Sequence, residues 1–267
     1  LKEKNVSVKV FAPYGYYQEF KDKGIDIDKE FAIKISELEA GDWISLFELG
    51  FTDPVAVAIE NAISVLKRDK KMESFGFNHI RNEIKNLKET SQEVKNSAIA
   101  LFDSADTWGV FNEEKGTVIS DLVEAGTTTV IDLSMYASLG SFNVRGLIIG
   151  LVSKKLFAER MAARKYEEIQ AVQHGLDYLY FKPKREMTLV WIFIDEAHEF
   201  LPHESVGKTP ASDALIQLLR EGRQPGISIV MATQQPGKIH TDAMTQSDIL
   251  ISHRITAAPD VKALNEI

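Results

Sequence analysis

The sequence predicts an α/β fold with a mostly parallel sheet and helices on both of its faces. Three observations support this prediction. Nearly continuous apolar runs at 187–194, 227–232 and 249–255 are typical of strands buried inside a parallel sheet. Segments with helical periodicity separate these runs, as the connections between parallel strands require. The composition is that of a globular chain, because 44% of the 267 residues are hydrophobic and 26% are charged.

The first half of the chain combines a strand with a helical region. Residues 6–11 alternate apolar and polar side chains, which predicts a β-strand. Asp53 followed by Pro54 is typical of an N-cap and a first helical position, and the apolar spacing beyond them indicates an amphipathic helix. The helical pattern continues to about residue 114 with few strand signals.

The second half alternates strands and helices. The residues at 129–133 predict a strand, and a long helical run follows from about 142 to 168. Between the strands at 187–194 and 227–232, Thr209 is a candidate N-cap with Pro210 at the first helical position, and a glycine at 222 ends that helix.

Length and pattern together indicate one large α/β domain that is interrupted by helices. We assign residues 1–53 to the first part of the sheet core, residues 54–115 to a helical insertion and residues 116–267 to the rest of the core. No apolar run approaches the roughly 20 residues that a membrane helix needs, so we expect no membrane segment and a cytoplasmic location. The chain does not start with methionine, and we expect it to be part of a longer protein.

Charge and cysteine content exclude some functions. The 39 acidic and 31 basic residues give a net charge of −8, which argues against a uniformly positive surface but allows a local basic channel. The absence of cysteine excludes thiol catalysis, disulfides and cysteine-ligated zinc. Residues 67–95 are locally basic. A solvated helix face is the simpler interpretation of this stretch, and a nucleic-acid contact is the alternative.

The strongest chemical signal is the pair of carboxylates Asp195 and Glu196 at the end of the apolar run 187–194. Open α/β sheets bind ligands at the carboxyl ends of their strands, so this pair suits nucleotide hydrolysis. Asp195 is expected to hold Mg²⁺, and Glu196 to polarise a water for attack on the γ-phosphate, as in a Walker B motif. The alternative is an ordinary core strand followed by an acidic helix cap.

Two further motifs fit the same chemistry. Gln234 follows the apolar run 227–232 and would lie beside the carboxylates if the two strands are neighbours, where it could sense the γ-phosphate. Arg220 and Arg223 flank the end of a predicted helix. They either neutralise the helix dipole or act as an arginine finger in a neighbouring subunit, which would require an oligomer.

Other patterns are weaker. The sequence Gly207-Lys208-Thr209 resembles the tail of a phosphate-binding loop, but the required upstream glycine is Pro202, so we interpret Lys208 as a loop residue. The histidines, among them His198, lack the spacing of a zinc site. The aromatic residues near Tyr14 are expected to serve packing. Those at 178–181, beside the basic residues at 182–185, are a minority candidate for base stacking.

The ordered set of motifs resembles the C-terminal half of the HerA/FtsK superfamily of P-loop ATPases, and most closely its HerA-like branch. The resemblance covers about residues 187–267. It rests on the segments 195–202 (DEAHEFLP), 219–227 (LREGRQPGI) and 232–236 (ATQQP), on Gln246 and on 253–255 (HRI).

The resemblance implies a RecA-like core, ATP and Mg²⁺ as cofactors, a hexameric homo-oligomer, and translocation or unwinding of double-stranded DNA, with a NurA-like nuclease as a partner in DNA repair. It assigns the Walker B aspartate to Asp195, the catalytic glutamate to Glu196, the polar sensor to Gln234 and the trans-acting finger to Arg220 or Arg223. The chain departs from the family in lacking a Walker A loop and an N-terminal barrel, so we expect it to be inactive by itself.

Two alternatives stay open. A secretion or conjugation coupling ATPase of the same superfamily would share these motifs. A ring or scaffold module that has lost hydrolysis would explain the missing loop. A two-lobed DEAH-type helicase would need a second lobe, for which too few residues follow the last predicted strand.

Overall fold

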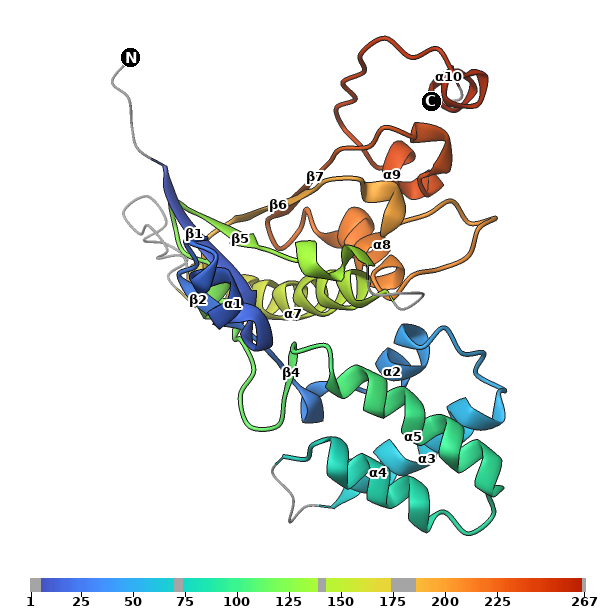
Figure 1. Ribbon diagram of the computed structural model, residues 1–267. Helices are drawn as coiled ribbons and strands as arrows, with labels where there is room; N and C mark the ends of the chain where they lie inside the picture. Colours follow the sequence, from blue (N-terminus) through green and yellow to red (C-terminus); the bar gives the residue numbers. More distant parts are fainter. Residues whose placement is uncertain (1–5, 70–73, 139–142, 174–185, 266–267) are drawn as a thin grey trace. The chain divides into compact units, whose positions relative to one another are not determined.

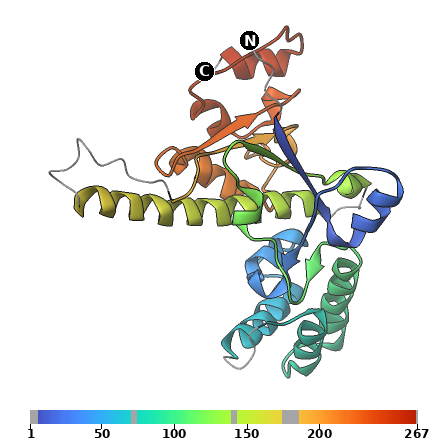
Figure 2. The ribbon, with the colours of Figure 1, turned by 90° about the vertical axis from the view of Figure 1, so that its left-hand side faces the viewer.

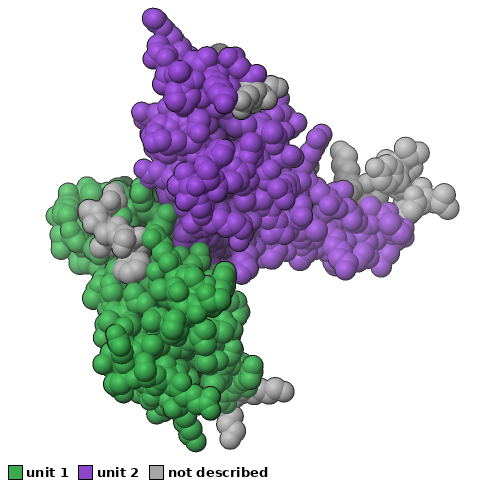
Figure 3. All heavy atoms as spheres, turned by 90° about the vertical axis from the view of Figure 1, so that its right-hand side faces the viewer, with its two compact units in different colours: residues 1–145 green, residues 146–267 purple. Residues whose placement is uncertain are grey.

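The computed structural model describes residues 6–69, 74–138, 143–173 and 186–265. The chain forms two compact units, residues 1–145 and residues 146–267, which Figure 3 colours separately. The mixed α/β class is confirmed, and every strand pair in the described residues is parallel.

The first unit contains a three-stranded sheet in the order β2-β1-β5 (Figure 1). Its strands are β1 (Ser7–Pro13), β2 (Lys29–Phe31) and β5 (Thr127–Ile131). The strands expected near residues 6–11 and 129–133 are therefore present, each shifted by one or two residues. A two-stranded ladder pairs β3 (Ile33–Lys34) with β4 (Phe111–Asn112).

Helices make up most of the rest of this unit. They are α1 (Tyr17–Asp22), α2 (Ala40–Leu46), α3 (Pro54–Arg68), α4 (Phe77–Asn86), α5 (Gln92–Asp106) and α6 (Ile119–Leu122), with 3-10 turns η1 (Tyr14–Tyr16), η2 (Ile35–Glu37) and η3 (Ser134–Ser138). The expected helix start at Asp53-Pro54 is confirmed: Asp53 occupies the N-cap of α3, and its carboxylate accepts a hydrogen bond from the Gly50 amide at 2.7 Å.

An aromatic core holds α2, α4 and α5 together. Trp43 in α2 is fully buried, and its ring lies 4.9 to 5.8 Å from four phenylalanine rings, those of Phe47, Phe77, Phe102 and Phe111. Buried aromatic rings at these separations add edge-to-face attraction to their hydrophobic burial. The aromatic core thus extends beyond residues 54–115 to α2, and the description of 54–115 as an insertion stays a prediction.

The second unit is built around one parallel strand pair. The long helix α7 (Val144–Gln173) leads into it, and Figure 2 shows α7 from the side as a single continuous helix. The remaining elements are β6 (Val190–Ile194), η5 (Ala197–Glu199), α8 (Ser212–Glu221), β7 (Ile227–Met231), η6 (Pro236–Lys238), α9 (Thr241–Thr245) and α10 (Ala258–Asn265).

One face of the β6–β7 pair forms the core of this unit. Ile194 is buried and packs with Leu215 of α8, and the partly buried Ile192, Ile229 and Met231 lie against the same cluster. The cluster is completed by residues of the loops, turns and short helix that follow the two strands: Ala197, Phe200, Leu201, Ala211, Ile239 and Ala243. The segments that follow the two strands are thus anchored by hydrophobic burial.

Arg160 connects α7 to the starts of both strands. Its side chain is 1% exposed, and it donates hydrogen bonds to the carbonyl of Met187 before β6 and to the carbonyl of Pro225 before β7, each at 2.8 Å. Glu167, one of the few other buried charged residues, lies 3.5 Å from the same guanidinium. A buried charge needs such partners, so Arg160 aligns the two strands.

The opposite face of the strand pair is open to solvent. Trp191 is 64% exposed and Phe193 is 73% exposed, and they share this face with Val230, which pairs in register with Phe193. Both runs are nearly continuously apolar in the sequence, which predicted burial on both faces, but the described residues cover only one face of the strand pair.

Two details of the predicted second half are wrong. Residues 249–255 form no strand: they have no strand partner in the described residues, and Ile249 is 80% exposed and Ile251 84% exposed. Apolar, β-branched residues favour a strand only when a neighbouring strand accepts their hydrogen bonds. The helix expected from Pro210 begins at Ser212, because Pro210 and Ala211 form a turn that the Ser212 amide closes by donating to the Thr209 carbonyl at 3.0 Å. No helix among the described residues is long and apolar enough to span a membrane.

Candidate functional site

The carboxyl ends of β6 and β7 bring the main candidate residues together. The strands pair in parallel from Val190↔Ile227 to Ile194↔Met231, so both chains leave the sheet at the same edge. Asp195 and Glu196 follow β6 directly, and Gln234 lies three residues after β7. The condition set by the sequence, that these two strands be neighbours, is met.

Glu196 has an unusual backbone conformation. Its φ of 46° and ψ of 46° lie in the left-handed region, which is uncommon for a residue with a Cβ atom. The Glu196 amide donates to Oδ1 of the exposed Asp195 at 3.0 Å, and the Ala197 amide donates to the Ala232 carbonyl at 2.9 Å. The chain therefore turns sharply at Glu196 and stays attached to the end of β7.

Gln234 contacts Glu196 directly. Its Nε2 donates to Glu196 Oε1 at 2.5 Å, a short hydrogen bond to a charged acceptor. The Glu196 side chain is 33% exposed, so the carboxylate is both held and accessible. A carboxylate and an amide joined in this way can together orient a water molecule that lies beside them, because each keeps a further acceptor oxygen.

His198 also belongs to this site. From the sequence it was examined only as a possible metal ligand. Its Nδ1 lies 2.9 Å from Thr233 Oγ1 and 3.4 Å from Glu196 Oε2, and its Nε2 lies 3.2 Å from Gln235 Nε2. The residues Thr233 and Gln235 flank Gln234 in the segment after β7. The signal that could have indicated this role is the polar run 233–235, which faces the turn after β6.

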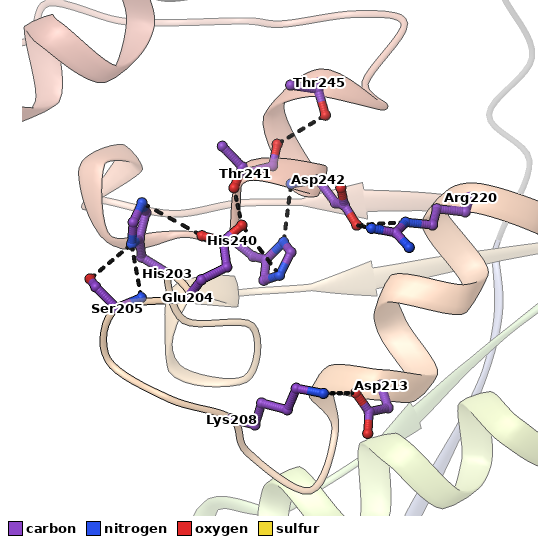
Figure 4. A network of polar contacts seen from close by, with 10 residues as sticks. All are labelled: His203, Glu204, Ser205, Lys208, Asp213, Arg220, His240, Thr241, Asp242 and Thr245. Atoms are coloured by element: carbon purple, nitrogen blue, oxygen red, sulfur yellow. Dashed lines mark hydrogen bonds and ion pairs between the residues drawn. The ribbon is translucent and has the colours of Figure 1, made fainter.

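The two candidate arginines lie elsewhere in the unit. Arg220, at the carboxyl end of α8, donates from Nε and Nη2 to Asp242 Oδ2 of α9 at 2.8 and 2.7 Å (Figure 4). Arg223 is exposed in the loop before β7. Within the described residues, neither arginine forms a hydrogen bond or ion pair with Asp195, Glu196 or Gln234.

A polar network anchors α9 beside Arg220 (Figure 4). Glu204 accepts a hydrogen bond from the Thr241 hydroxyl and lies 3.4 Å from His240 Nε2. The hydrogen bond from Thr241 is the largest cause of a lowered pKa of the Glu204 carboxyl, and the neighbouring His240 and His203 act in the same direction.

The segment Gly207-Lys208-Thr209 does not have the geometry of a phosphate-binding loop. The described residues just before it form turns rather than a strand. Lys208 Nζ bonds Asp213 Oδ1 at 2.7 Å, and the Thr209 hydroxyl donates to the Phe200 carbonyl at 2.5 Å. These contacts fix the loop to the start of α8.

The described residues hold no group of three or more His, Asp or Glu side chains that could bind a metal by protein ligands alone. The exposed Asp195 carboxylate fits Mg²⁺, which usually takes one or two carboxylates and completes its shell with water and phosphate.

Several basic residues of the stretch 67–95 have acidic partners. Arg81 pairs with Asp103 and Asp106 at 2.7 and 2.6 Å, and Lys67 pairs with Glu39 at 2.6 Å. These contacts agree with the simpler interpretation of that stretch as a solvated helix face. The aromatic and basic residues at 178–185 lie outside the described residues.

Comparisons with known proteins found one matching family model and two similar curated proteins. The family model described as zonular occludens toxin (Zot) matches residues 140–258, which include β6, β7 and the site. A probable DNA double-strand break repair helicase HerA from Methanocaldococcus jannaschii is 27% identical over 153 residues. The chain is thus a relative of the HerA/FtsK-type P-loop ATPases. A DNA double-strand break repair helicase HerA from Pyrococcus furiosus is 24% identical over 144 residues.

These HerA matches involve about half of the chain, 51% and 52%. They cover 30% of the length of the first HerA protein and 26% of the second. The chain therefore spans less than a third of each HerA relative, and the second unit is the part that the Zot model matches.

Proposed function

We propose that the second unit is the hydrolytic half of an ATP-driven motor that moves along or unwinds double-stranded DNA. The observation that carries this proposal is the contact between Gln234 and Glu196 at the shared edge of β6 and β7. The similarity to P-loop ATPases supplies the chemistry, and the HerA relatives, which are described as DNA double-strand break repair helicases, supply the DNA repair context.

In this proposal Glu196 is the general base. Its carboxylate lies at a strand end, 33% exposed, and accepts the proton of the water that attacks the γ-phosphate. Gln234 orients that water and the carboxylate together, because its amide donates to Glu196 Oε1 and its carbonyl oxygen is a second acceptor.

Asp195 is the proposed holder of Mg²⁺, which would neutralise charge on the phosphates when bound. Its Oδ1 already accepts from the Glu196 amide, so one side of its carboxylate is oriented by the backbone turn. ATP binding by this chain alone is not expected, because its sequence lacks a Walker A loop and Lys208 is paired with Asp213.

Arg220 and Arg223 are the proposed trans-acting groups. Both lie at the end of α8 or just after it, away from the contacts of Glu196, which suits a role at the site of a neighbouring subunit. A hexameric ring, a NurA-like nuclease partner and a cytoplasmic location remain parts of the proposal.

ATPase measurements on the full-length gene product test this function. We expect hydrolysis that double-stranded DNA stimulates, that is lost in Glu196→Gln, and that is unchanged in Glu159→Gln, an exposed carboxylate of α7. Absence of hydrolysis in the wild-type gene product would instead favour the hydrolysis-deficient module. Stimulation by a membrane or secretion partner rather than by DNA would favour the coupling ATPase.

A further inference from the structure

We propose that His198 is a positioning residue for Glu196 and acts as the neutral tautomer with its proton on Nδ1. The tautomer is inferred from the geometry of the segment 233–235. The expected effect on kinetics also rests on the proposed function. None of the roles assigned above to Asp195, Glu196, Gln234 or the arginines includes His198.

The tautomer follows from the partner of Nε2. Gln235 Nε2 lies 3.2 Å from His198 Nε2, and an amide nitrogen can only donate. His198 Nε2 must therefore accept, which leaves the proton of the neutral ring on Nδ1.

The other contacts of the ring agree with this assignment. Thr233 Oγ1 already accepts from the Gln235 amide at 3.0 Å, and its second lone pair is available to the Nδ1 proton at 2.9 Å. Thr233 and Gln235 thus hold the imidazole from both sides. The His198 side chain is 13% exposed, so these protein partners are the main ones it has.

The oriented ring faces the carboxylate of Glu196. Oε2 of Glu196 is buried, makes no hydrogen bond within the described residues, and lies 3.4 Å from His198 Nδ1. Its other oxygen, Oε1, is held by Gln234. The Nδ1–H group gives its hydrogen bond to Thr233, but its positive end lies beside the oxygen that Gln234 does not reach and stabilises that oxygen through space.

This arrangement also links the two strands. Three consecutive residues after β7 contact the turn after β6: Gln234 reaches Glu196 directly, whereas Thr233 and Gln235 reach it through His198. A displacement of the 233–235 segment, for example by a bound γ-phosphate, would move Gln234 and the His198 ring together, and both lie against the Glu196 carboxylate.

Nuclear magnetic resonance on the 267-residue chain tests the tautomer without any need for catalysis. We expect the ring nitrogen shifts of His198, assigned by their loss in His198→Asn, to show a proton on Nδ1. In Gln235→Glu the new carboxylate accepts from Nε2, and we expect the proton to appear there. A wild-type ring protonated on Nε2, or a pattern unchanged in Gln235→Glu, overturns the proposal.

Kinetics on the full-length gene product test the positioning role. His198→Leu is expected to lower kcat for ATP about 10-fold with little change in KM, because the ring orients the base and does not reach the nucleotide. His198→Asn retains a nitrogen donor near the Nδ1 position and is expected to recover most of the lost kcat, whereas His198→Gln, whose nitrogen lies near Nε2, is not.

Thr233→Val is a second variant that preserves side-chain shape and removes the hydroxyl acceptor. It is expected to lower kcat in the same direction, and it guards against misfolding of the His198 variants. Equal kcat in His198→Leu and wild type, with Glu196→Gln inactive, contradicts the positioning role while leaving the proposed function intact. A wild-type gene product without hydrolysis contradicts the proposed function, and the resonance experiment then still decides the tautomer.

Discussion

Gln234 Nε2 donates a hydrogen bond to Glu196 Oε1 at 2.5 Å and joins the segments that follow two neighbouring parallel strands. Glu196→Gln in the full-length gene product keeps the size of the side chain but removes the base. ATP hydrolysis is expected to fall by about 100-fold or more, as for loss of a general base, with ATP binding retained. Turnover and nucleotide affinity measured separately check this, and near-normal turnover with unchanged binding would remove Glu196 from the catalytic role.

The buried Arg160 gives a prediction on stability. Arg160→Ala leaves the Met187 and Pro225 carbonyls and Glu167 without their donor, so the free energy of unfolding of the second unit is expected to fall by about 3 kcal/mol or more. Urea denaturation measures this change. Arg164→Ala is the matched control: Arg164 is 45% exposed and pairs with Glu168 on the same helix, so its loss is expected to cost less than about 1 kcal/mol. Similar losses in both variants would contradict the structural role of Arg160.

Substitution of Trp43 tests the aromatic core of the first unit. Trp43→Ala removes a fully buried ring that contacts four phenylalanines, and a loss of about 3 to 5 kcal/mol is expected. Phe51→Ala is the control, because Phe51 is 77% exposed and has little packing to lose. Thermal unfolding of both variants, followed by near-ultraviolet circular dichroism, measures the difference. If Phe51→Ala lowered stability as much as Trp43→Ala, the aromatic cluster would not be the main core of these helices.

The arginines can be separated by complementation. Arg220→Ala and Arg223→Ala are each mixed with Glu196→Gln, which retains both arginines but has no base. If an arginine acts in trans, two inactive proteins form some competent subunit interfaces, and hydrolysis is expected to reappear in the mixture. An arginine whose variant stays inactive after mixing acts within its own subunit. For Arg220 that outcome would agree with its ion pair to Asp242.

The carboxyl of Glu204 predicts a pH dependence. Its pKa is lowered in the folded chain, chiefly by the Thr241 hydroxyl, so its contribution to stability is present above the pKa of the unfolded chain. This contribution is lost as the pH falls below the ordinary glutamate pKa of about 4.3 and through the lower pKa of the folded chain. Hydrogen exchange of the α9 amides between pH 3 and 6 is expected to show weaker protection at the acid end, and a flatter profile in Glu204→Gln. The effect is expected to be small, because the Glu204 side chain is 44% exposed.

The sequence was sufficient to predict features that depend on local pattern. The apolar strands before Asp195 and before Gln234, and the helix start at Asp53, are where the pattern indicated them. The proximity of Gln234 to Glu196 was also predictable, because parallel neighbouring strands end at one edge of a sheet.

Features that depend on partners could not be predicted in this way. The apolar run 249–255 has the composition of a strand, but hydrophobicity does not determine whether another strand is available to pair with it. The contacts of His198 with the 233–235 segment and of Arg220 with Asp242 join residues 22 to 37 positions apart. Such contacts arise from tertiary packing and leave no periodic signal in the sequence.

The left-handed backbone at Glu196 lowers the folding stability at the position that carries the proposed base. A residue with a Cβ atom costs about 1 to 2 kcal/mol in this conformation, whereas glycine adopts it freely. A redesign that ranked residues by folding free energy alone would therefore replace Glu196 by glycine. That substitution would relieve the backbone strain in the turn after β6 but would remove the proposed base. Computational stabilisation of the protein should therefore leave Glu196 unchanged.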